Sequence, residues 1–155
     1  MISKANLNKI IGTEASDELL GKNIDNSAGH DTLTGTSGDD LIDGKSGNDT
    51  ISGLAGDDVL IGGSGHDTLK GGSGNDDIFG DSGDDTISTG SGNDSVWGGS
   101  GDDTITSTSG TDIIDAGAGD DSIDLPNGDN GSVAFSSANY AKLDGGTGND
   151  TLDFT

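Results

Sequence analysis

The sequence predicts an all-β protein, a parallel β-solenoid in which two nine-residue units make each 18-residue coil. The first observation is an unbroken run of eleven such units from Asn26 to Asp124. The second is that each unit ends in a short segment of β-forming residues. The third is that Leu, Ile, Val and Phe make up only about 19% of the chain, too little for a conventional globular core.

Three columns of the repeat hold one kind of residue in all eleven units. The fourth position is always glycine: Gly29, Gly38, Gly47, Gly56, Gly65, Gly74, Gly83, Gly92, Gly101, Gly110 and Gly119. The sixth is always aspartate: Asp31, Asp40, Asp49, Asp58, Asp67, Asp76, Asp85, Asp94, Asp103, Asp112 and Asp121. The eighth is always a branched aliphatic: Leu33, Ile42, Ile51, Leu60, Leu69, Ile78, Ile87, Val96, Ile105, Ile114 and Ile123.

Each unit is expected to form a turn followed by a strand. Its first six residues are rich in Gly, Ser, Asn and Asp, which favour turns, and glycine also lets neighbouring backbone approach closely. The last three place one aliphatic between polar residues, so the aliphatic points inward and its neighbours point outward. Stacked coils then give two facing sheets with a thin aliphatic layer between them.

The composition excludes several classes of partner. The formal charge of −23 opposes binding to nucleic acid and to anionic lipid. The absence of cysteine excludes disulfides and thiolate zinc sites. No apolar run approaches the roughly 18 residues of a membrane span, and the opening MISKANLNKI lacks the apolar stretch of a secretion signal. Low hydrophobicity with high charge predicts disorder in plain buffer, so a cation is the expected partner.

Stacking brings the sixth-position carboxylates together along both edges of the solenoid. Asp49, Asp67 and Asp85 would lie about 5 Å apart, where like charges repel by a few kcal/mol. A hard divalent cation between loops would reverse that repulsion, and calcium suits it best because it accepts six to eight oxygens in flexible geometry. Eleven loops on two edges leave nine gaps, so about nine Ca²⁺ ions would add +18 and bring −23 to −5.

Units such as GGSGHDTLK and GGSGNDDIF match the pattern GGxGxDxUx, in which U is a large aliphatic residue. The chain therefore resembles the RTX calcium-binding nonapeptide family. The resemblance implies a parallel β-roll in which sixth-position aspartates, with Asp150 of the unit GGTGNDTLD, and carbonyls near the fourth-position glycines hold calcium. It also implies a secreted bacterial protein that leaves the cell through type I secretion and folds outside in calcium.

The repeat also sets the expected divisions of the chain. Residues 1–25 form an N-terminal cap with the degenerate unit GTEASDELL, 26–124 the eleven-unit roll, 125–144 a capping insertion, and 145–155 a final repeat. Ala141 stands where an aspartate is needed, so no calcium is expected there. The ending just after a repeat, at Thr155, suggests a segment of a longer protein.

Some units depart from the pattern, and the loops at both ends of the array are expected to hold calcium loosely. The first glycine is replaced at Asn26, Thr89, Ser107 and Ala116. The second is replaced at Ser27, Thr36, Lys45, Leu54, Asp81 and Thr108. The central sites should be the tightest.

No catalytic motif is present, so the chain is predicted not to be an enzyme. It lacks HExxH, GxSxG and a Walker loop. His30 and His66 lie two coils apart, about 10 Å, and are interpreted as exposed turn residues.

Two outer faces remain open to interpretation. Ile61, Phe79 and Trp97 form an apolar stripe that either docks an adjacent domain or a second copy, or is covered by residues 125–143. The opposite sheet carries files of Thr and Ser that resemble ice-binding faces, although Lys70 and Asp124 interrupt them. The alternative function is therefore a structural or interaction segment of a large bacterial adhesin or surface-layer protein. No residue selects the activity of the parent protein.

Overall fold

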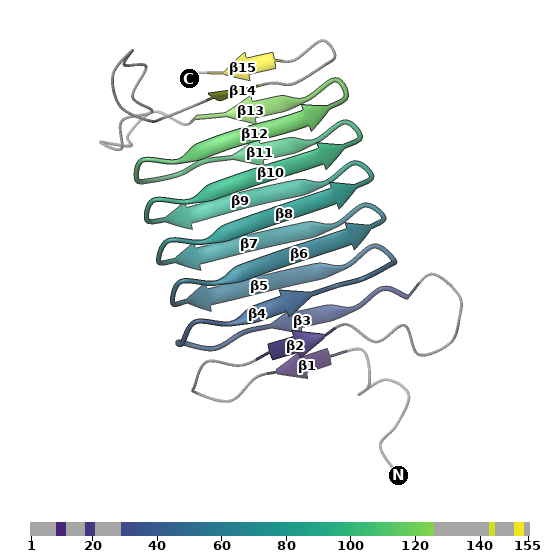
Figure 1. Cartoon of the computed structure of the whole chain (residues 1–155), viewed down its shortest axis with the longest axis vertical. Helices are drawn as coiled ribbons and strands as arrows, with labels where there is room; N and C mark the ends of the chain where they lie inside the picture. Colours follow the sequence, from purple (N-terminus) through teal and green to yellow (C-terminus); the bar gives the residue numbers. More distant parts are fainter. Residues whose placement is uncertain (1–8, 12–17, 21–28, 126–142, 145–150, 154–155) are drawn as a thin grey trace.

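The computed structural model describes residues 9–11, 18–20, 29–125, 143–144 and 151–153. These residues contain parallel strands and no helix, so none of them forms a helix that could cross a membrane. The strands stack into a narrow solenoid with turns along both edges (Figure 1), which confirms the predicted fold class.

Consecutive strands alternate between two parallel sheets. One sheet contains, in spatial order, β1 (Lys9–Ile11), β3 (Thr32–Thr34), β5 (Thr50–Ala55), β7 (Thr68–Ser73), β9 (Thr86–Ser91), β11 (Thr104–Thr106), β13 (Ser122–Asp124) and β15 (Thr151–Asp153). The other contains β14 (Leu143–Asp144), β12 (Ile113–Ala118), β10 (Ser95–Ser100), β8 (Asp77–Ser82), β6 (Val59–Ser64), β4 (Leu41–Asp43) and β2 (Glu18–Leu20).

The register repeats with the predicted period. Leu69 lies opposite Ile51 on one side and Ile87 on the other, so each residue pairs with its equivalent one coil away. The pairing continues across both interruptions of the period, since Ile10 lies opposite Leu33 and Leu143 lies opposite Ile114. The chain at both ends therefore adds further rungs to the same two sheets. The predicted caps lie largely outside the described residues, and the division into 1–25, 26–124, 125–144 and 145–155 stays a prediction.

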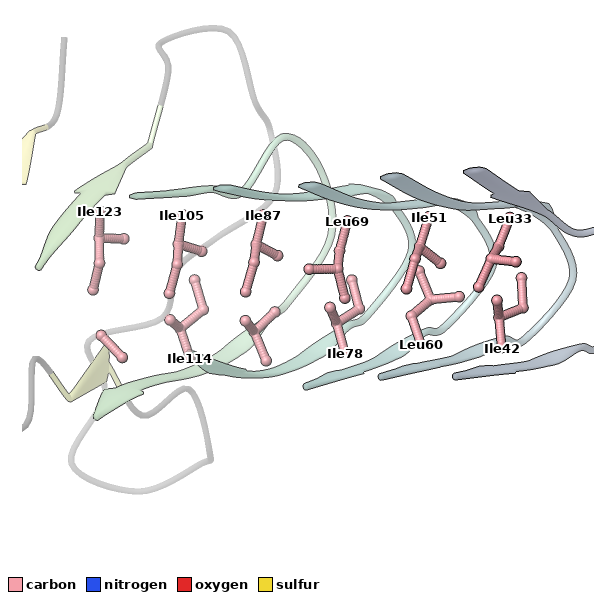
Figure 2. Close-up of a cluster of buried hydrophobic side chains, with 12 residues drawn as sticks. Leu33, Ile42, Ile51, Leu60, Leu69, Ile78, Ile87, Ile105, Ile114 and Ile123 are labelled. Carbon is pink, nitrogen blue, oxygen red and sulfur yellow. The ribbon is translucent and has the colours of Figure 1, made fainter. Parts of the chain in front are cut away.

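The core is the eighth-position ladder (Figure 2). Its members from Leu33 to Ile123 are at most 2% exposed, and residues from the two sheets face one another. Burying one such side chain stabilises the fold by about 1.5–3 kcal/mol, so the ladder is the main apolar contribution.

The strands of the central coils are longer than predicted. β5 to β10 and β12 span six residues, because pairing continues through the first three positions of the next unit. The first-position glycine, as at Gly62, faces inward without a side chain, so adjacent coils stay at hydrogen-bonding distance. Ser64 N–H donates to Lys45 O at 3.0 Å, and Gly65 N–H donates to Ser82 O at 2.8 Å. The turn proper is therefore only positions four to six.

The structure explains why the fourth position is always glycine. Gly56 has a φ of 115°, in the region that residues with a side chain rarely adopt. A Cβ at Gly56 would lie 2.6 Å from the carbonyl oxygen of Gly38, the equivalent glycine one coil earlier. The fourth-position glycines from Gly47 to Gly119 all share this positive φ and close contact, so the backbone conformation and the close stacking both require glycine there.

Candidate metal centre

The sixth-position aspartates point into the solenoid. In each unit positions six, eight and one are buried, as expected when alternate residues of an extended chain face the same side. The aspartate therefore lies on the inner side beside the aliphatic ladder, and Asp31 to Asp121 are at most 5% exposed. The spacing predicted that these aspartates lie at the edges of the solenoid. They are two residues from the aliphatic position, and this even separation was the signal that they also face inward.

From Asp49 to Asp121, one carboxylate oxygen of each sixth-position aspartate accepts a backbone N–H from the preceding coil. Asp49 N–H donates to Oδ1 of Asp67 at 2.7 Å, and Asp67 N–H donates to Oδ1 of Asp85 at 2.7 Å. The same bond recurs on the other edge, where Asp58 N–H donates to Oδ1 of Asp76 at 2.9 Å. These bonds hold the sixth-position column in register and leave the second oxygen for another partner.

That second oxygen, Oδ2, is buried and lacks a hydrogen-bond partner in most of the described loops. This holds for Asp31, Asp49, Asp58, Asp67, Asp76, Asp85, Asp94 and Asp103. A buried polar atom without a partner costs about 1–3 kcal/mol, and a charged one costs more. Such a row of atoms indicates a ligand that satisfies all of them.

A small space lined by oxygen lies next to these atoms in the described units whose first position is glycine. A Cβ built on Gly44 would lie 2.5 Å from Asp49 Oδ2 and 2.7 Å from the carbonyl oxygen of Gly62, the first-position residue one coil on. One carboxylate oxygen and one carbonyl oxygen therefore converge at each first-position glycine. Hard oxygen donors of this kind suit calcium. The carbonyls of the fourth-position glycines instead approach the next glycine of their own column, as Gly38 O does at Gly56.

Burial makes these carboxyls hard to ionise without a cation. It raises the pKa of Asp49, Asp58, Asp76, Asp94 and Asp103 to about 6, and the pKa of Asp85 to about 7. It also raises the pKa of Asp31 and Asp67. The N–H of the neighbouring coil opposes this effect, while the charges of Asp67 and Asp103 add to it at Asp85. A bound divalent cation would favour the ionised form instead.

The protein side chains do not build a metal site alone. Within the described ranges no three His, Cys, Asp or Glu side chains converge into a metal-binding group. Backbone carbonyls would have to complete any coordination shell. Asp150 lies outside the described residues, so its role as a ligand stays a prediction.

The fifth-position side chains have a role that was not predicted from the sequence. Asn48 Oδ1 accepts the N–H of His66 at 3.0 Å, and His66 Nδ1 accepts the N–H of Asp84 at 2.8 Å. His30 Nδ1 likewise accepts the N–H of Asn48. Both histidines are exposed, as predicted, and both also link neighbouring coils. The signal was available, because every fifth position carries an acceptor close to Cβ: His, Asp, Asn or Thr.

Comparison with known families agrees with this geometry. Segments 25–60, 52–87, 61–96, 88–123, 97–131 and 142–153 match the RTX calcium-binding nonapeptide repeat. Comparisons with curated proteins and with solved structures gave no match. The matched segments cover more than half of the chain, so the solenoid is a β-roll of calcium-binding repeats, and the chain belongs to the RTX calcium-binding nonapeptide repeat family.

Proposed function

We propose that this chain is a calcium-binding module of a secreted bacterial protein, disordered without calcium and folded by calcium outside the cell. The observation that carries the proposal is the row of buried carboxylate oxygens without a partner. Their desolvation opposes folding while they are charged and unliganded. A ligand that binds only the folded chain contributes its binding free energy to folding, so calcium would decide whether the roll closes.

The residues that would hold calcium are the sixth-position aspartates through Oδ2. The carbonyl of the first-position residue one coil on is the nearest backbone donor, as at Gly62 for Asp49. Carbonyls near the fourth-position glycines remain candidates to complete the shell. A bound Ca²⁺ supplies positive charge and open coordination positions, and about nine ions would fill the gaps between loops.

The composition supports export through the type I route, which would carry the chain out of the cell unfolded. A chain with a charge of −23 and 27% hydrophobic residues has little to hold it compact where calcium is scarce. Millimolar calcium outside the cell would then close the roll, at an extracellular or cell-surface location. The repeat family is structural, and we assign no catalytic role to the chain.

The test is far-ultraviolet circular dichroism during a calcium titration that starts in chelator, with magnesium as the control. We expect a cooperative change from coil to β structure in calcium and none at equal concentrations of magnesium, because magnesium demands stricter geometry. A chain that is already β-rich in chelator would contradict calcium-dependent folding.

The apolar stripe favours a second candidate, an interaction segment of a large adhesin or surface-layer protein. Phe79 and Trp97 stack face to face, with ring centroids 4.6 Å apart and planes 4° apart, and Trp97 remains 39% exposed. Ile61 pairs beside Phe79 in the same sheet. Sedimentation of Trp97→Asp in calcium tests this function, with Thr86→Asp on the opposite sheet as the control. Loss of a dimer in Trp97→Asp alone supports assembly, whereas a strictly monomeric parent opposes self-association.

A further inference from the structure

Two sixth-position aspartates differ from the others, because protein hydroxyls already bind their Oδ2 atoms. Thr36 donates to Asp40 Oδ2 through its N–H at 2.7 Å and through Oγ1 at 3.0 Å. Ser107 Oγ donates to Asp112 Oδ2, and Thr89 Oγ1 lies 3.4 Å from the same atom. Both aspartates are on the same edge, below and above Asp58, Asp76 and Asp94.

The backbone of these two loops also differs, at the second position of the unit. Among the second positions that the structure describes, all the others have a positive φ. They are Lys45, Leu54, Gly63, Gly72, Asp81, Gly90, Gly99 and Gly117. Thr36 and Thr108, in the two exceptional units, do not. A β-branched residue strongly disfavours the left-handed region, so the backbone at these two threonines keeps a φ outside it.

This change has a direct consequence at Asp40. With Thr36 outside the left-handed region, its N–H and its hydroxyl both face the Asp40 carboxylate. The units of Asp40 and Asp58 otherwise share an inward glycine at the first position, Gly35 and Gly53. The second-position residue, Thr36 or Leu54, is therefore the difference that decides whether Oδ2 is satisfied.

We infer that the loops at Asp40 and Asp112 close without calcium, because hydroxyl donors, joined at Asp40 by an N–H, hold the carboxylate oxygen that a cation would otherwise bind. Threonine at the second position marks these loops in the sequence. The gap between Asp40 and Asp58 then holds no ion, and on this edge the calcium column starts at Asp58. The inference rests on the proposed function and goes beyond it, since it assigns which repeats of the array leave calcium out.

The test replaces the second-position residue in each of two matched units, those of Asp40 and Asp58. Thr36→Gly removes the hydroxyl and permits a positive φ, so it should add about one bound calcium per chain. Leu54→Thr imposes threonine beside Asp58 and should remove about one, while Leu54→Gly is the control that leaves the number unchanged. Leu54 is 49% exposed and lies outside the buried core, so replacing it leaves the aliphatic ladder intact.

Bound calcium is counted by equilibrium dialysis at saturating concentration, and circular dichroism verifies that each variant is folded. An unchanged count in folded Thr36→Gly, or in folded Leu54→Thr, overturns the inference while the parent's calcium binding stands. A parent chain that binds no calcium overturns the proposed function and this inference together. Loss of an ion in Leu54→Gly as well as in Leu54→Thr also overturns it, since threonine would then have no special effect.

Discussion

At the scale of single residues, the two oxygens of a sixth-position carboxylate have different environments. Asp67 Oδ1 accepts the N–H of Asp49, and its buried Oδ2 has no hydrogen-bond partner. The first oxygen links neighbouring coils, and the second is the atom that we propose binds calcium. A substitution that keeps one oxygen and removes the charge can therefore separate the two roles.

Asp67→Asn is that substitution. The amide oxygen can still accept the N–H of Asp49, but the anionic ligand is gone, so calcium binding at this loop should weaken at least tenfold. In calcium-free buffer the variant should be as stable as the parent or more so, because no buried charge remains. Asp84→Asn is the matched control: it removes the same charge from an exposed residue one coil away. Equal shifts of the calcium midpoint in both variants would contradict the assignment.

The fifth-position residues are expected to affect stability but not calcium binding. His66→Ala deletes the acceptor for the N–H of Asp84 and should lower the free energy of unfolding by about 0.5–1.5 kcal/mol, whereas His66→Asn should restore it. Thermal unfolding in saturating calcium measures both. Neither variant should alter the number of bound ions, and a lost ion in His66→Ala would show that the fifth position helps to bind metal.

At the scale of the strand and its turn, the second position carries strain. Leu54 has a φ of 83° and Lys45 a φ of 74°, where a side chain costs about 1–2 kcal/mol. Leu54→Gly should therefore raise the free energy of unfolding in calcium by roughly 1 kcal/mol. Ala55→Gly, at the next position without a positive φ, should lower it by about 0.5–1 kcal/mol. Denaturant melts compare them, and a destabilised Leu54→Gly would show that the leucine makes contacts that outweigh the strain.

The same elements show what the sequence could predict. The 18-residue register and the aliphatic ladder followed from the period, because Ile51 and Leu69 must share a face when the units stack. The six-residue strands did not, since pairing at Gly63 and Ser64 depends on how closely two coils approach. The donors to Asp40 and Asp112 were also missed. Thr36 and Ser107 were seen as departures from glycine, but their hydrogen bonds depend on backbone angles that spacing does not specify.

At the scale of the whole molecule, the stacked carboxyls couple folding to protons as well as to calcium. In the folded chain the pKa of Asp49, Asp58 and Asp76 is about 6, and that of Asp85 about 7, against an ordinary value of 3.8. Between these values the folded chain binds more protons than the unfolded chain. The free energy of unfolding without calcium must therefore rise as the pH falls from about 7 to about 4.

Calcium should reverse this dependence. Ligand carboxylates must be ionised, so calcium affinity should fall over the same range in which the calcium-free roll gains stability. Circular dichroism from pH 7.5 to pH 4.5 without metal should show β structure appearing on acidification. Calcium titrations at several pH values in the same range should show a calcium midpoint that rises as the pH falls. Sodium chloride at pH 7.5 is the control, because it screens surface charge but leaves the buried carboxyls ionised. If salt alone produced as much β structure as acid, general repulsion among the 29 acidic residues would explain the disorder. If acid produces more, the buried column of carboxyls is the element that keeps the roll open until a cation or a proton neutralises it.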